Sequence, residues 1–184
     1  SAENLAAIRA RGHHWLVAGH QSERADYLEQ FQEEEGWQEI VREASSRNPG
    51  QKKVRVLVKP AAGADGAQTL ALCWSEGRTL KDRAIRERAQ ARFLADIEKL
   101  QGRIASARLR QEAKIHEAIG RLKERYSRVA RYYQIHYEPA TGLLSWREDQ
   151  ARKQKAQALD GSYLLKTSRS DLDAEEIWRT CILL

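Results

Sequence analysis

Methionine is absent from this chain, and cysteine occurs only twice. Cys73 and Cys181 lie far apart in sequence and outside any C-x-x-C motif, which argues against a disulfide framework and against a zinc site. No apolar run reaches the length of a membrane-spanning helix. The sequence therefore predicts a cytoplasmic protein with either one sizeable hydrophobic core or one core with an appendage, no metal site and no membrane partner.

Other absences limit the chemistry. No glycine-rich phosphate loop occurs, and no serine, cysteine or lysine stands in a nucleophile motif, so no catalytic residue and no small-molecule substrate are predicted. The lack of methionine and the opening on Ser1 suggest a piece of a longer protein. The last helix gives the same indication: Asp173 and Glu176 form a capping box at its start, with Leu172 and Ile177 as the hydrophobic staple, but no stop signal follows.

Positive charge is concentrated in one segment. The whole chain has a net charge of +6, whereas residues 78–131 contain 16 Lys and Arg against 7 Asp and Glu, a balance of +9. Such a concentration is typical of a surface that holds a polyanion, because Lys and Arg that neutralise phosphates release counterions. A solvated helix face explains the same charges without any ligand, so both interpretations stay open.

The same segment has a helical apolar pattern, which predicts an antiparallel pair of helices. Gly102 and the stretch up to Gln111 offer the turn, and Gly120 is expected to let a neighbour approach closely. The two sets of apolar positions are Phe93, Ile97, Leu100 and Ile104, then Ile115, Ile119, Leu122, Tyr126 and Val129.

Around this pair the sequence predicts an α+β fold. Residues 2–11 are expected to form a helix with Leu5 and Ile8 inward, and residues 22–44 carry another helical pattern. Residues 147–158 are a polar connection whose pattern assigns no particular structure. Alternating apolar residues predict hairpins at 54–59 with 70–74 and at 134–138 with 143–147. Strands 15–18 and 163–167 are expected to share one sheet, interrupted by an insertion with a small β layer of its own.

Several short segments together resemble the insertion-sequence transposases of the DDE type. In that family an RNase H-like core presents two aspartates and a glutamate to divalent metal ions, which activate water and a DNA 3′-hydroxyl. The matching segments are ENLAAI at 3–8, HWLVA at 14–18, AIGRL at 118–122 with Tyr126 and RVA at 128–130, DGSYLLKT at 160–167 and AEEIW at 174–178.

The resemblance implies a fragment without its own catalytic residues. It places the second aspartate before Ser1 and the glutamate beyond Leu184, with Cys181 where relatives have a tyrosine and Leu184 where many have an arginine. Magnesium is therefore a cofactor implied for the longer protein and not for this chain. Residues 1–20 and 160–184 correspond to parts of the core, and residues 21–159, including the helical hairpin 78–131, correspond to the insertion.

DNA is the expected partner, and a homodimer is a further expectation. By the resemblance, Tyr163 stacks on a flipped base, whereas its position in a strand also fits an ordinary half-buried tyrosine. An alternative function is a non-catalytic basic α+β module that binds nucleic acid or dimerises through Phe93, Ile97 and Leu100. The predicted DNA-binding residues are Tyr163, Lys166, Arg103, Arg108, Arg110, Arg121, Lys123, Arg125 and Arg128.

Overall fold

The computed structural model describes residues 1–42, 50, 53–63 and 68–183, and it confirms the predicted α+β class. The chain divides into two compact units, each with its own core. Unit 1 comprises Ser1–Lys81 and Ala158–Leu184, and unit 2 comprises Asp82–Gln157. The 30-residue helix α3 (Glu76–Ala105) begins in unit 1 and contributes most of its length to unit 2.

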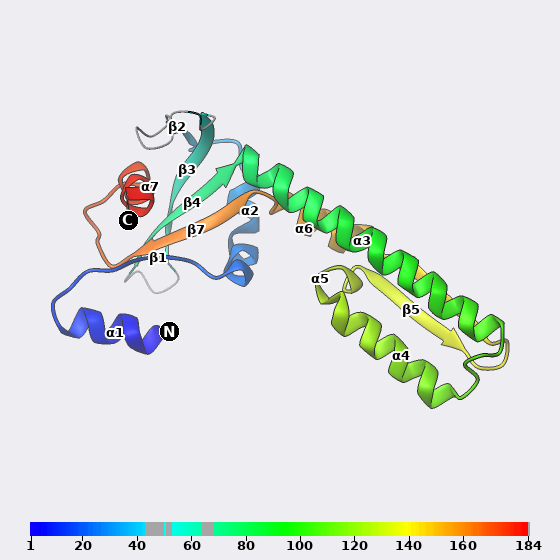
Figure 1. The fold of residues 1–184 in the computed structure, drawn as a ribbon. Coiled ribbons are helices and arrows are strands. Elements are labelled where there is room, and N and C mark those ends of the chain that lie inside the picture. The colour runs from blue at the N-terminus through cyan, green and yellow to red at the C-terminus, as the bar shows by residue number, and fades with distance from the viewer. Residues whose placement is uncertain (43–49, 51–52, 64–67, 184) are drawn as a thin grey trace. The chain divides into compact units, whose positions relative to one another are not determined.

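Unit 1 is built on a five-stranded antiparallel sheet with the order β1-β7-β4-β3-β2 (Figure 1). Its other elements are helices, and Asp173 and Glu176 form the predicted capping box of the last one. The elements are α1 (Ala2–Ala10), β1 (Leu16–Ala18), the 3-10 helix η1 (Gln21–Tyr27), α2 (Leu28–Gln32), β2 (Gln38–Arg42), β3 (Val54–Ala62), β4 (Thr69–Ser75), β7 (Ser162–Thr167) and α7 (Ala174–Leu183).

The expectation that strands 15–18 and 163–167 share one sheet is confirmed, and the two strands are direct neighbours, with Val17 of β1 opposite Lys166 of β7. The predicted hairpin of β3 with β4 is confirmed as well, with Val58 opposite Cys73. The β layer expected for the insertion holds only for the hairpin predicted at 134–138 with 143–147, which forms a separate two-stranded sheet. The other hairpin does not belong to it, because β4 pairs directly with β7 and places β3 and β4 in the same sheet as β1. The assignment of residues 21–159 to an insertion in a parent fold stays a prediction.

One face of this sheet packs against α7. Alternate residues of a strand point to the same face, so Val56 and Val58 of β3 are both buried there, where Ile177 and Trp178 of α7 pack against them. Leu172 packs against the same cluster, as the predicted staple requires. A helix start fixed by its cap thus places the apolar face of α7 on the sheet.

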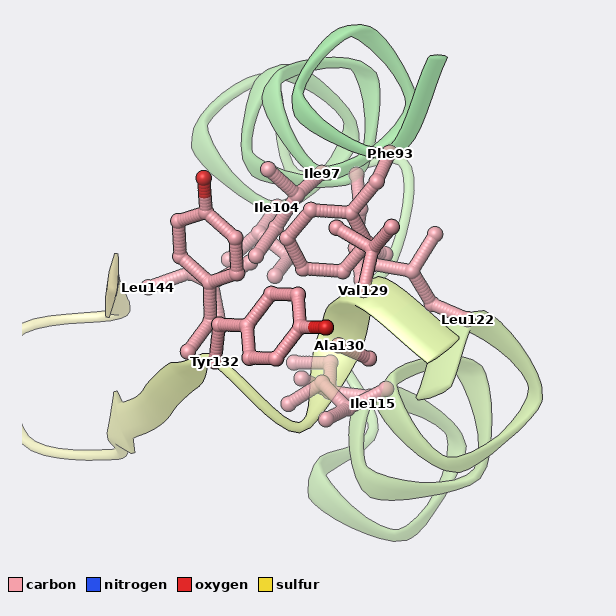
Figure 2. Packing of buried hydrophobic residues seen from close by; sticks show 12 residues of the cluster. Phe93, Ile97, Ile104, Ile115, Leu122, Val129, Ala130, Tyr132 and Leu144 are labelled. Carbon is pink, nitrogen blue, oxygen red and sulfur yellow. The ribbon is translucent and has the colours of Figure 1, made fainter. Parts of the chain in front are cut away.

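Unit 2 has a core formed by helices and a β-hairpin. Apolar side chains of α3 face those of α4 (Glu112–Arg125), and the predicted helical pair is confirmed (Figure 2). The predicted second hairpin is confirmed as β5 (Tyr133–Glu138) with β6 (Leu143–Glu148). Figure 2 shows Tyr132 and Leu144 on one side of the helical side chains. Val129 of α5 (Ser127–Ala130) lies close to Phe93 and Leu122, and Ala130 of the same helix lies near Ile115.

The turn of the helical pair lies within the predicted stretch 102–111. Gly102 itself is inside α3, and the chain turns after Ala105, where Ala107 adopts a positive φ of 56°. Burial decides this, because Ile104 continues the apolar stripe past the glycine. The expected close approach at Gly120 is wrong, because no described neighbour lies within 4 Å of the position a Cβ would take. Most of the polar connection 147–158, for which the sequence predicted no particular structure, forms helix α6 (Gln150–Ala158).

The helical pattern of residues 22–44 also holds only in part. Helical structure ends at Gln32, and β2 begins at Gln38, with Ile40 buried opposite Val56 of β3. The turn of the hairpin predicted at 54–59 with 70–74 was expected over residues 61–66, of which 64–66 lie outside the described residues. Helix α1 forms as predicted, but Leu5 is only half-buried and Ile8 is exposed, so its expected inward face is wrong.

Candidate nucleic-acid interface

A groove with a volume of about 490 Å³ lies between α3 and α4 of unit 2. Five of its lining residues are cationic and two are acidic, which gives the lining a balance of +3. Four apolar or small residues line the rest of it. The lining consists of Asp96, Lys99, Leu100, Arg103, Leu109, Lys114, Glu117, Ala118, Arg121, Leu122 and Arg125.

Helical spacing lines up the charges of this groove. On α3, Asp96, Lys99 and Arg103 follow one another at three and four residues, so they lie along one face. On α4 the same spacing aligns Lys114, Glu117, Arg121 and Arg125, the last two at intervals of four residues. Because neighbouring apolar positions of both helices are buried in the shared core, the charged rows border the groove.

The two carboxylates of the groove hold four of its five cations. Asp96 accepts a hydrogen bond from the Tyr126 hydroxyl at 2.8 Å, and it pairs with Lys99 at 3.3 Å and Arg125 at 3.4 Å. These donors, the Tyr126 hydroxyl first, lower the pKa of Asp96 below its ordinary value. Since Tyr126 and Arg125 come from the α4 side, Asp96 also ties α3 to α4.

Glu117 neutralises the other side of the groove. Lys114 lies 3.3 Å from its carboxylate, and Arg121 pairs with the same group. The hydrogen bond from Lys114, followed by the charge of Arg121, lowers the pKa of Glu117 below its ordinary value. Arg103 is exposed and has no ion-pair partner among the described residues. Within the described part of the chain, Arg103 is thus the one groove cation that is not paired with a carboxylate.

The predicted DNA-binding residues are not all brought together. Arg103, Arg121 and Arg125 line the groove. Arg108 and Arg110 lie in the turn after α3 and are exposed, with the Arg110 Nε donating to the Ala107 carbonyl at 2.9 Å. The remaining two cations of unit 2 in the predicted set, Lys123 and Arg128, are exposed but do not line the groove.

Lys99 and Lys114 line the groove but were missed by the sequence prediction. A signal for both was present. Lys99 precedes Arg103 by one helical turn, and Lys114 precedes Arg121 by two. Recognising them requires the register of α3 against α4, which the Asp96 to Arg125 pair now defines.

Tyr163 and Lys166 belong to unit 1 and have protein partners there. The Tyr163 hydroxyl accepts a hydrogen bond from Trp178 Nε1 at 2.7 Å, and the Arg78 guanidinium lies 5.0 Å from the ring centre. Burial raises the pKa of Tyr163. Lys166 pairs with Glu23 at 2.7 Å. These contacts account for both residues without a ligand, and base stacking by Tyr163 stays a prediction.

Dimerisation through Phe93, Ile97 and Leu100 is wrong, because these three side chains are 0%, 0% and 6% exposed inside the core of unit 2. A surface that is already buried cannot meet a second copy. A homodimer formed through other residues stays a prediction.

Other clusters of titratable groups are occupied by local contacts. His20 Nδ1 lies 2.7 Å from the Ser22 hydroxyl, and Asp171 pairs with Arg169, which lowers its pKa to about 2. Cys73 is a free buried cysteine whose pKa burial raises to about 12. In the described ranges, no three His, Cys, Asp or Glu side chains gather to hold a metal, and no helix is long and apolar enough to cross a membrane.

Net charge follows the division into units. Asp82–Gln157 contains 18 Lys and Arg against 10 Asp and Glu, a balance of +8, which leaves −2 for unit 1 within the total of +6. The net charge of the unit that contains the groove, +8, therefore exceeds the net charge of the whole chain, +6.

Comparison of the chain with protein-family models, with curated proteins and with solved structures gives no match. The resemblance to insertion-sequence transposases thus stays a prediction from the sequence.

Proposed function

We propose that this chain is a fragment of a DDE transposase and that the groove between α3 and α4 binds the phosphate backbone of DNA. The observation that carries the binding role is the convergence of five cations on one groove, three of which the sequence had assigned to DNA. The resemblance of the short segments along the chain supports the family assignment.

The side chains of the groove suit phosphates better than bases. Lys and Arg neutralise phosphate oxygens and so fix the position of a duplex. Sequence is read by Asn or Gln on adenine, by Arg or Lys on guanine, or by aromatic rings that stack on bases. The described lining contains no Asn, Gln or aromatic ring, and four of its five cations are paired with Asp96 or Glu117. The groove is therefore proposed chiefly as a positioning contact on the DNA backbone.

The proposal gives residues 1–184 no catalytic step. Residues 1–20 and 160–184 are proposed as parts of an RNase H-like core, whose metal-binding carboxylates the resemblance places outside this sequence. Divalent metal ions would belong to the longer protein. Magnesium-dependent nicking of DNA by that longer protein is the observation that would support the family assignment.

The binding role is tested with the 184-residue chain and a fluorescent DNA duplex at several salt concentrations. We expect micromolar affinity that falls linearly as log salt rises. Replacing Arg103→Gln should weaken binding to all sequences alike and reduce the salt slope by about one unit. Arg147→Gln removes the same charge from β6, where Arg147 is exposed outside the groove, and serves as the matched control.

Two outcomes would contradict the binding role. One is the absence of DNA binding even at low salt. The other is an equal loss from Arg103→Gln and from Arg147→Gln, because the net charge of the chain and not the groove would then determine the affinity.

A further inference from the structure

We propose that Glu117 is a built-in competitor of phosphate, which keeps the groove weak for a single anion and so makes it select a polyanion. This inference rests on the proposed DNA-binding role of the groove. Glu117 is an acidic side chain in a row of cations. A groove that only had to attract an anion would bind it more strongly without a carboxylate at this position.

Among the described residues, Glu117 makes no hydrogen bond or ion pair with another element. Its two partners are on its own helix, Lys114 one turn before it and Arg121 one turn after it. Its side chain is 43% exposed, and those of Lys114 and Arg121 are 61% and 74% exposed. Exposed pairs of this kind contribute little to stability. What Glu117 does in this place is to occupy two cations that point into the groove.

Asp96 differs from Glu117 in this respect. It is 24% exposed, and it accepts the Tyr126 hydroxyl bond that links α3 to the end of α4. Replacing Asp96 would disturb the helical pair itself. Glu117 can be replaced without breaking any bond between elements, which makes it the residue that isolates competition from structure.

The arrangement of charges predicts that the groove has a lower affinity for a single phosphate than for a DNA backbone. Arg103 is available to a first phosphate, whereas Lys114 and Arg121 become available only when the Glu117 carboxylate is displaced. A lone phosphate gains one contact and must then displace the acid. A DNA backbone held at Arg103 presents its next phosphates at a high effective concentration, so displacement follows from the first contact.

The experiment compares Glu117→Gln with Glu98→Gln in the full 184-residue chain. Glu98 is an exposed residue of α3 that does not line the groove. Each variant removes one carboxylate and so raises the net charge of unit 2 by one. We expect Glu117→Gln to bind the duplex about two- to five-fold tighter, with a salt slope steeper by about one unit. We expect Glu98→Gln to stay close to the unmodified chain, because exposed distant charges are screened.

Two further measurements use the same assay. Inorganic phosphate should displace the duplex from Glu117→Gln at a lower concentration than from the unmodified chain. The loss caused by Arg121→Gln should be larger in the Glu117→Gln background, because Arg121 is then unpaired before DNA arrives. Circular dichroism checks that α4 stays folded, and Glu117→Ala is a second variant if it does not.

The outcomes separate this inference from the proposed function. If the unmodified chain binds no DNA, both are overturned. If it binds DNA and Glu117→Gln is no tighter than Glu98→Gln, the competition is refuted and the binding role stands. Weaker binding by Glu117→Gln would also refute the competition, since Glu117 would then hold its cations in position for the phosphate.

Discussion

Phe93 provides the sharpest test of the core of unit 2. Its side chain is fully buried, with the ring centre 4.8 Å from that of Tyr133 and 6.0 Å from that of Tyr126. The Phe93→Ala change removes both aromatic contacts and leaves a cavity. Truncation of a buried phenylalanine costs about 3 to 5 kcal/mol, a large share of the stability of a small unit.

Hydrogen exchange followed by mass spectrometry measures this loss for each unit separately. A loss of about 3 kcal/mol accelerates exchange of the best-protected amides roughly a hundred-fold. We expect that acceleration in α4 and β5, with amides of β3 and β4 unchanged. Ile85→Ala is the control, because Ile85 lies on the same helix but is 47% exposed, and its change should stay within about 0.5 kcal/mol.

The reasoning would be refuted by a Phe93→Ala loss below about 1 kcal/mol, the size expected of a surface position. Equal acceleration in the sheet of unit 1 would also refute it, because Phe93 would then not act within the core of unit 2 alone.

Three other changes test particular contacts. Gly161→Ala should destabilise the sheet by about 1 to 3 kcal/mol in urea unfolding, because Gly161 has a φ of +80° and a Cβ would lie 2.7 Å from the Ser75 carbonyl oxygen. Asp173→Ala should cost about 1 kcal/mol through loss of the α7 cap, whereas Asp173→Asn should keep most of it. Burial alone would raise the pKa of Glu148, but hydrogen bonds from Lys153 and Tyr133 outweigh it and lower that pKa. The contribution of Glu148 should therefore be present above about pH 4.5 and be lost as the pH falls through its folded pKa, and Glu148→Gln should flatten the pH dependence of the unfolding midpoint in that window.

Local signals predicted the elements that bury a regular apolar face. Phe93, Ile97, Leu100 and Ile104 predict a helix and also name its buried side, because one spacing determines both. Helix α6 lacked such a signal. Its sequence QARKQKAQA consists of good helix formers, but Ala156 is its one apolar residue that packs against the described core, so no apolar pattern assigned a structure to it.

The order of strands could not be predicted, because it depends on contacts that are distant in sequence. Val54, Val56 and Val58 indicate a strand, yet nothing in them shows that β4 pairs with β7 on its other side. Strand β2 has Ile40 as its one buried residue, so its sequence has no alternating apolar pattern that would predict a strand. Its hydrogen bonds to β3 hold it in the sheet instead. The groove was missed in part for the same reason, because Lys99 and Lys114 line one groove only when α3 packs against α4.

The position of β7 between β1 and β4 has a consequence for the order of folding during synthesis. Domains generally fold as units while the chain emerges, N-terminal parts first. Here Val17 must wait for Lys166, nearly 150 residues later, before β1 has a partner. All residues of the unit 2 core lie between β4 and β7 in sequence. We therefore expect the basic unit to be folded while the sheet of unit 1 still has an unfilled place, so the later segment completes the fold that the first segment began.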